Sequence, residues 1–187
     1  MNTLLDRHDL VLADLDGTLY QGRAAIPGAV DAIRAAADRG VRTLYITNNA
    51  ARSPGDVAAH LAELGYPAGA DDVATSSQAA AALLAEQLSD GSKVLVVGTA
   101  ALGAEITAVG LTPVDSADGA TAVVQGLDPQ LRYATLAEST GVRPTAVISA
   151  PSAAVPTTST LAPSGICSAS SAAAACELVA TSSAPAG

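Results

Sequence analysis

The stretch VLADLDGTLYQG, residues 11–22, decides the fold because two aspartates, Asp14 and Asp16, directly follow a short apolar run. An apolar run of this length, rich in Val and Leu, is typical of a buried strand in a parallel sheet. Holding two carboxylates close together is costly unless a cation lies between them or one of them carries a proton. The sequence therefore predicts a strand over residues 10–16 that ends at a charged site.

Strand and helix patterns alternate along the rest of the chain. Short apolar runs predict further strands over residues 41–46, 72–76, 93–97 and 121–127. Helical spacing and capping residues predict helices ending before Gly40, from Ser53 to Gly65, around Leu83–Leu88, ending before Gly110, and from Asp128 to about Ser139. Repeated strand–helix units build parallel sheets, so we expect an α/β protein with a Rossmann-like parallel core.

Polar residues stand at the carboxyl ends of the first two predicted strands. Asp14 and Asp16 end the first strand, and Thr47 and Asn48 end the second. Open α/β sheets bind their ligands outside the carboxyl ends of the strands. Mg²⁺ takes oxygen ligands, usually including one or two carboxylates, and would offset the charge of the aspartate pair. We therefore expect a Mg²⁺ and phosphate site at this edge.

Each residue type in this pattern has a use in phosphoryl transfer. One carboxylate can attack a phosphoryl group, while the other protonates the leaving oxygen and later activates water. Gly17 and Thr18 allow a sharp turn and would present N–H groups to phosphate oxygens. The hydroxyl of Thr47 and the amide of Asn48 would complete the phosphate cradle.

Two motifs, DLDGTLY (14–20) and LYITNN (44–49), resemble the first and second motifs of the haloacid dehalogenase superfamily of phosphohydrolases. The similarity covers about residues 8–139 and is to the subfamily of p-nitrophenyl, phosphoglycolate and glycerol-3-phosphate phosphatases. It implies magnesium-dependent hydrolysis of a small phosphorylated metabolite, a glycerol 3-phosphate-like monoester, through an aspartyl-phosphate. It also implies a core sheet with an inserted α/β cap.

The same resemblance assigns roles to residues. It implies that Asp14 is the nucleophile and a Mg²⁺ ligand, and that Asp16 is the acid/base and offers its backbone carbonyl to the metal. The implied substrate-binding residues are Gly17, Thr18, Thr47, Asn48 and Asn49.

The resemblance also divides the chain into expected domains. Residues 1–90 would form the first half of the core, and residues 91–143 a partial cap. Residues 144–187 are a tail rich in Ala, Ser, Thr and Pro with one charged residue, Glu177. Such a composition does not readily specify a packed core, so we expect coil there, with at most a short helix over residues 170–180.

The residues after the predicted cap depart from the family pattern. Family members carry a third-motif lysine and fourth-motif aspartates there, whereas this sequence has no lysine after Lys93 and no aspartate after Asp128. We therefore expect a truncated or frame-disrupted phosphatase with an incomplete core and little or no activity, the alternative being a natural low-complexity tail. A noncatalytic phosphate-binding protein and a nonfunctional product are the alternative functions. The strand over residues 10–16 would then be an exposed edge, open to self-association.

Composition limits the classes of binding partner and the cellular compartment that we expect for this protein. The net charge of −9 argues against binding to nucleic acid or to anionic membranes. The sequence contains no apolar run long enough for a membrane span and no signal-peptide core. Cys167 and Cys176 form neither a zinc motif nor a disulfide framework. We expect a cytoplasmic protein with a small-molecule substrate.

Overall fold

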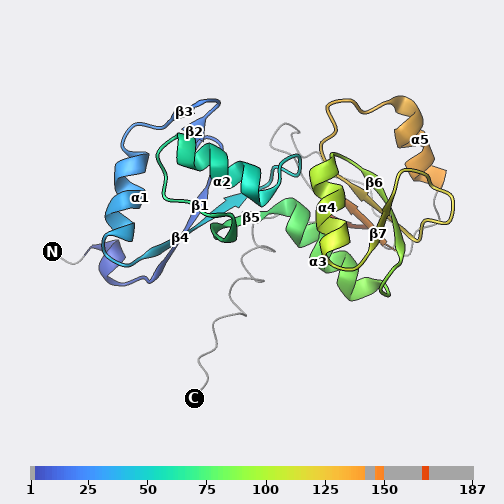
Figure 1. Ribbon diagram of the computed structural model, residues 1–187, viewed down its shortest axis with the longest axis horizontal. Coiled ribbons are helices and arrows are strands. Elements are labelled where there is room, and N and C mark those ends of the chain that lie inside the picture. The colour runs from blue at the N-terminus through green and yellow to red at the C-terminus, as the bar shows by residue number, and fades with distance from the viewer. Residues whose placement is uncertain (1–2, 142–145, 150–165, 169–187) are drawn as a thin grey trace, which may run out of the picture. The chain divides into compact units, whose positions relative to one another are not determined.

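The computed structural model describes residues 3–141, 146–149 and 166–168. The chain divides into two compact units, which are labelled by their helices and strands in Figure 1. The first unit comprises Met1–Thr47 and Ser53–Ala74, and the second comprises Asn48–Arg52 and Thr75–Gly187.

The first unit is built around a three-stranded sheet in the order β1-β4-β5. Strand β1 pairs in parallel with β4, with Leu10 opposite Arg42 and Asp14 opposite Ile46. A short antiparallel hairpin, β2-β3, follows β1 in the chain. The elements are η1 (Leu4–Asp6), β1 (Leu10–Asp14), β2 (Tyr20–Gln21), β3 (Ala24–Ala25), α1 (Ala29–Ala37), β4 (Arg42–Thr47), α2 (Pro54–Glu63), η2 (Ala70–Asp72) and β5 (Val73–Thr75).

Local sequence explains where the helices of this unit begin. Gly28 precedes α1 with φ of 81°, a left-handed conformation that glycine adopts without strain. Ser53 caps α2, because its hydroxyl accepts a hydrogen bond from the N–H of Asp56 while the Asp56 carboxylate accepts one from the N–H of Ser53. The helices and the sheet share one apolar core: Ala13, Leu15, Leu19, Tyr20, Ile33, Tyr45, Val57, Ala58, Leu61, Tyr66 and Val73.

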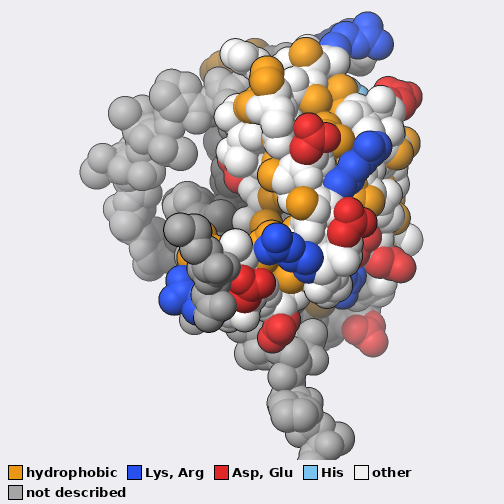
Figure 2. Space-filling model, turned by 90° about the vertical axis from the view of Figure 1, so that its left-hand side faces the viewer, with side chains coloured by type: hydrophobic (Ala, Val, Ile, Leu, Met, Phe, Trp, Pro, Cys, Tyr) orange, Lys and Arg blue, Asp and Glu red, His pale blue; other side chains and the backbone are white. Residues whose placement is uncertain are grey.

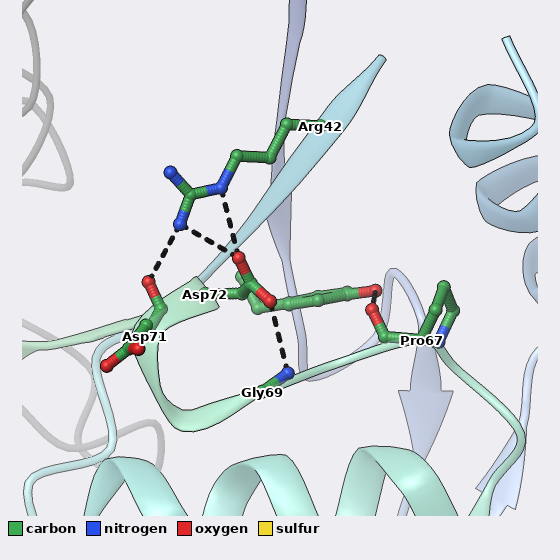
Figure 3. A network of polar contacts seen from close by, with 6 residues as sticks. Arg42, Pro67, Gly69, Asp71 and Asp72 are labelled. Atoms are coloured by element: carbon green, nitrogen blue, oxygen red, sulfur yellow. Dashed lines mark hydrogen bonds and ion pairs between the residues drawn. The ribbon is translucent and has the colours of Figure 1, made fainter. Parts of the chain in front are cut away.

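A polar network joins the start of β4 to the segment between α2 and β5 (Figure 3). The guanidinium of Arg42 donates to the Asp72 carboxylate at 2.9 and 3.0 Å and to the Asp71 carbonyl at 3.1 Å. The other carboxylate oxygen of Asp72 accepts from the N–H of Gly69. The hydroxyl of the fully buried Tyr45 donates to the Pro67 carbonyl at 3.0 Å. These contacts tie residues 67–72 to β4.

The second unit contains a five-stranded parallel sheet in the order β10-β9-β8-β6-β7. Its core combines side chains of α3, α4, β6 and β8 with Ala50. The elements are α3 (Ser76–Gln87), β6 (Lys93–Val97), α4 (Ala100–Ala108), β7 (Thr112–Val114), β8 (Ala122–Gln125), α5 (Tyr133–Gly141), β9 (Ala146–Ser149) and β10 (Ile166–Ser168).

The α/β class and the Rossmann-like parallel pairing predicted from the sequence are confirmed. Several elements differ from the predictions, and β1 ends at Asp14 rather than at residue 16. Strand β7 and the β2-β3 hairpin were not predicted, and α5 begins at Tyr133 rather than at Asp128. The prediction of coil after residue 143 does not hold for β9 and β10, whose sequences AVIS and ICS contain β-branched residues. The possible helix over residues 170–180 lies outside the described residues.

The predicted domain ranges, 1–90, 91–143 and 144–187, stay predictions. The two compact units divide the chain differently, since α3 belongs to the second unit, together with β6 and α4. None of the helices in the described part of the chain has the length and apolar character of a membrane span.

Candidate functional site

The first predicted site residue, Asp14, is the last residue of β1 and is exposed to solvent. It lies opposite Ile46 in the parallel register with β4, and Thr47 is the last residue of β4. The register therefore brings the carboxyl ends of both strands to one edge of the sheet of the first unit. Ligands of open α/β sheets bind at such an edge.

A tight turn after β1 carries Asp16, Gly17 and Thr18, all of them exposed. The carbonyl of the buried Leu15 accepts hydrogen bonds from three successive N–H groups, those of Thr18, Leu19 and Tyr20. Gly17 has φ of 81°, which explains why glycine is required at this point of the turn. Because Leu15 is buried between the two aspartates, the turn exposes Asp14 and Asp16 while it stays attached to the core.

A tyrosine that the sequence analysis did not single out holds this turn. The hydroxyl of Tyr66, from the segment after α2, donates to the carbonyl of Leu19 at 2.5 Å. Tyr66 is buried, and its burial raises the pKa of the phenol, so the hydroxyl keeps its proton for this bond. Its aromatic ring also packs edge-on against that of Tyr45. Tyr66 thus links the aspartate turn to the core of the first unit.

One predicted detail of the turn is corrected by the structure. Gly17 and Thr18 were expected to present their backbone N–H groups to phosphate. Instead, the N–H of Gly17 donates to the carbonyl of Tyr20 at 2.8 Å, and the N–H of Thr18 donates to that of Leu15 at 3.2 Å. Both donors are used to close the turn, because a turn this tight pairs its own amides. The side-chain hydroxyl of Thr18 is the polar group that Thr18 can offer at this position.

Asn48 and Asn49 follow Thr47 in the chain and belong to the second unit. The side-chain carbonyl of Asn49 accepts from the N–H of Ala51 at 2.9 Å, a local turn typical of asparagine. The structure thus brings Asp14, Asp16 and Thr47 together within one unit. The predicted cradle that would combine them with Asn48 and Asn49 stays a prediction.

Three hydroxyl groups of the second unit hold the segment that contains these asparagines. Ser76 donates to the carbonyl of Asn48 at 3.0 Å, Ser77 to that of Ala50 at 3.1 Å, and Thr99 to that of Ala51 at 3.1 Å. Ser76 and Ser77 open α3, and Thr99 precedes α4. The backbone of residues 48–51 is therefore fixed by side chains that are distant in sequence.

The carboxylates at the end of β1 supply some, but not all, of the oxygen ligands that a Mg²⁺ ion needs. Asp14 and Asp16 supply oxygen atoms, the ligand type that Mg²⁺ prefers, and both are exposed. In the described ranges, no group of three or more His, Cys, Asp or Glu side chains lies close enough to hold an ion. Mg²⁺ commonly keeps several waters and binds one or two carboxylates. The two aspartates match that mode rather than a cage made only of protein ligands.

Comparison with known proteins points to one family. A model of the haloacid dehalogenase-like hydrolases matches residues 11–112. The chain is 49% identical over 140 residues to D-glycerol 3-phosphate phosphatase of Mycobacterium tuberculosis, a match that covers 74% of this chain and 39% of that protein. It is 41% identical over 133 residues to acid sugar phosphatase of Staphylococcus saprophyticus, covering 71% and 51%. The chain therefore spans about half the length, or less, of these curated relatives.

The fold is also similar to that of a solved relative. The crystal structure of a glycerol phosphate phosphatase from Mycobacterium tuberculosis, determined in complex with magnesium, superposes with a TM-score of 0.72 at 44% sequence identity. The superposition covers 81% of this chain and 46% of that one. A complex of the same phosphatase with calcium gives a TM-score of 0.73.

Proposed function

The chain belongs to the haloacid dehalogenase-like hydrolase family, and on that premise we propose that it carries the nucleophile and phosphate ligands of a magnesium-dependent phosphomonoester hydrolase. The observation that carries the proposal is the exposed Asp14 at the carboxyl end of β1, inside the segment that matches the family. The proposed substrate is a small phosphate monoester similar to glycerol 3-phosphate, since the relative that is 49% identical is a D-glycerol 3-phosphate phosphatase.

The proposed reaction uses two carboxylates in turn. A carboxylate oxygen of Asp14 attacks phosphorus, the bond from phosphorus to the substrate oxygen breaks, and Asp16 gives its proton to the departing alkoxide. Asp16 then takes a proton from a water molecule, which attacks phosphorus and releases phosphate from Asp14. Thr18, Thr47, Asn48 and Asn49 are proposed to bind the phosphate oxygens during both steps.

Mg²⁺ would be held by Asp14 and by the backbone carbonyl of Asp16, and it would supply positive charge to the phosphate oxygens. The chain's own contribution is to hold Asp14 at the end of a strand and Asp16 on a turn anchored by Leu15 and Tyr66. Rigid placement of this kind matters, because a nucleophile must be held close to the reacting atom in the correct orientation.

A second candidate function is noncatalytic binding of phosphate. It is favoured by the sequence after the predicted cap, which has no lysine after Lys93 and no aspartate after Asp128. A single electrostatic group at an active site is worth about 3–4 kcal/mol of transition-state stabilisation. We therefore expect the 187-residue chain to turn over phosphomonoesters slowly or not at all.

The test is to measure phosphate release from glycerol 3-phosphate and p-nitrophenyl phosphate by the full chain, with Mg²⁺ and with a chelator. Asp14→Asn is the test variant, and Asp9→Asn is the matched control, because Asp9 is an exposed aspartate at the opposite end of β1. Any magnesium-dependent turnover should disappear in Asp14→Asn and persist in Asp9→Asn. Turnover that survives in Asp14→Asn would show that Asp14 is not the nucleophile.

A chain without turnover is examined for binding of inorganic phosphate, with and without Mg²⁺. Magnesium-dependent phosphate binding that is weakened by Asp14→Asn, in the absence of turnover, supports the noncatalytic function. Neither binding nor turnover, together with a lack of hydrogen-exchange protection in residues 3–90, identifies a nonfunctional product.

A further inference from the structure

Two consecutive serines at the start of α3 donate their hydroxyl groups to carbonyls outside that helix. The helix is capped by other residues, because the Thr75 hydroxyl accepts from the N–H of Gln78 at 3.2 Å while the Gln78 side chain accepts from the N–H of Thr75 at 2.9 Å. Ser76 and Ser77, the first two helical residues, instead hold the backbone of residues 48–51. Their hydroxyls therefore serve the segment after β4 and not the cap of α3.

The two bonds lie on either side of Asn49, within the second unit. Ser76 donates to the carbonyl of Asn48 at 3.0 Å, and Ser77 donates to that of Ala50 at 3.1 Å. Because the two serines are neighbours on one helical turn, they hold the two carbonyls at a fixed separation. The backbone around the first asparagine of the pair is therefore set by α3, although the two segments are distant in sequence.

Apolar packing fixes the same segment through Ala50, which is fully buried in the core of the second unit. A Cβ atom added at Gly126 would lie 3.1 Å from the Cβ of Ala50 and 3.0 Å from the Cδ2 of Leu102. Glycine at this position therefore leaves the space that Ala50 occupies in a close-packed core. The hydroxyl of Thr99 adds a bond to the carbonyl of Ala51 at 3.1 Å. Packing and hydrogen bonds thus anchor the segment together.

Phosphate binding by this chain depends on the placement of polar groups more than on overall charge. The net charge of −9 does not attract an anion. On the face drawn in Figure 2, Lys and Arg side chains are interspersed with acidic and hydrophobic ones. Donors that are already held in the binding geometry lose little conformational freedom when the ligand arrives, so they contribute more to affinity. The groups that hold a phosphate ligand in place therefore matter here.

We propose that Ser76 and Ser77 are positioning residues that hold Asn48 for phosphate binding, an inference that rests on the proposed function. Asn48 is exposed, and its side-chain amide offers N–H donors to phosphate oxygens. Ser77 is 1% exposed and donates to a backbone carbonyl, so it acts on a ligand through the backbone and not by contact. Without these bonds, Asn48 would lose more conformational freedom on binding phosphate, and the affinity would fall.

The first experiment measures hydrogen exchange of single backbone amides in the full chain by NMR. The Ala51 amide is the probe, because it donates to the Asn49 side chain and is released when this turn opens. Ser77→Ala should speed its exchange by about threefold to tenfold, since the buried Ala50 carbonyl loses its donor, while the amides of β6 and β8 keep their protection. Thr75→Ala is the matched control, because the Thr75 hydroxyl is equally buried at the same helix end but bonds α3 itself. It should leave the Ala51 amide unchanged.

The second experiment measures the dissociation constant of inorganic phosphate for the full chain in the presence of Mg²⁺. Ser77→Ala should raise this constant by about threefold to tenfold, and Thr75→Ala should leave it nearly unchanged. The same Ser77→Ala change is then made in an Asn48→Ala background. It should have little further effect there, because a residue that acts through Asn48 no longer has that side chain to position. A merely structural role would weaken binding equally in both backgrounds.

The outcomes separate this inference from the proposed function. If wild type binds phosphate and Ser77→Ala binds it equally well, the inference is overturned while the proposed function stands. Equal weakening by Ser77→Ala in both backgrounds, or an Ala51 amide that exchanges no faster in Ser77→Ala than in Thr75→Ala, overturns it as well. A wild-type chain that neither binds phosphate nor hydrolyses phosphomonoesters refutes the proposed function, and the inference with it.

Discussion

Tyr45 stabilises the first unit in a way that depends on pH. Its side chain is fully buried, and its hydroxyl donates to the carbonyl of Pro67 at 3.0 Å. Burial, assisted by the nearby Asp72 carboxylate, raises the pKa of Tyr45 from 10.0 to about 12. The folded state thus favours the neutral phenol. This contribution to stability is complete below the unfolded pKa of 10.0 and is lost as the pH rises through 12.

We predict that the free energy of unfolding of the first unit falls steeply as the pH rises from 10.0 to about 12. Tyr45→Phe should lower stability near neutral pH by about 1 kcal/mol, because it removes one hydrogen bond and keeps the ring. The same variant should also show a smaller fall in the free energy of unfolding as the pH rises from 10.0 to about 12. Urea unfolding at a series of pH values measures both effects. Tyr133→Phe is the control, since Tyr133 is 87% exposed, and an equal change in that variant would contradict the argument.

The sequence singled out some candidate site residues and did not single out the residues that hold them, for a physical reason. Asp14 and Asp16 were recognisable because two carboxylates after an apolar run are costly without a function. Tyr66 and Ser77 were not, because the carbonyls that they hold, on Leu19 and Ala50, lie 47 and 27 residues away in sequence. The cost of leaving a buried carbonyl unpaired becomes visible only once the chain is folded.

At the scale of elements, Asp72 joins three segments of the first unit (Figure 3). Its carboxylate accepts two hydrogen bonds from Arg42 at the start of β4 and one from the N–H of Gly69 before η2. Its neighbour Asp71 takes part through its backbone carbonyl, which a change of side chain would leave in place. Substituting each of the two adjacent aspartates in turn therefore distinguishes the contribution of the hydrogen-bond network to stability from the contribution of negative charge.

We predict that Asp72→Ala lowers the free energy of unfolding of the first unit by about 1–2 kcal/mol, since it removes a partly exposed ion pair and a backbone acceptor. Asp71→Ala removes the same formal charge and should change stability by less than about 0.5 kcal/mol. Urea unfolding followed by circular dichroism measures the difference. Equal destabilisation by both substitutions would mean that net charge, and not the network, is responsible.

Elements with a clear sequence pattern were predicted correctly, and elements whose pattern conflicts with their structure were missed. Strand β6 occupies the predicted residues 93–97, because KVLVV contains a continuous apolar run rich in valine. Strand β7 was missed because it contains Pro113, which argues against a central strand. The structure resolves the conflict by placing β7 at the end of the sheet order, where proline is tolerated. Pairing with β6, which is distant in sequence, is what makes these residues a strand.

At the scale of the whole molecule, the chain has two compact units, each with a buried core. Leu61 lies in the core of the first unit and Leu102 in that of the second, and both are fully buried. Neither core shares a residue with the other. Truncating a buried leucine to alanine costs about 2–5 kcal/mol, because apolar contact is lost and a cavity forms. Two leucines of equal burial therefore allow the units to be compared.

We predict that each truncation acts on its own unit. Leu61→Ala should speed hydrogen exchange of the backbone amides of β1, β4 and α2 while those of β6, β8 and α4 keep their protection, because contacts are lost in the core of the first unit alone. Leu102→Ala should produce the reverse pattern, so each variant is the control for the other. Hydrogen exchange of the full chain, resolved by peptide and read by mass spectrometry, measures both patterns. Loss of protection in both sets of elements in either variant would show that the two cores unfold as one cooperative structure.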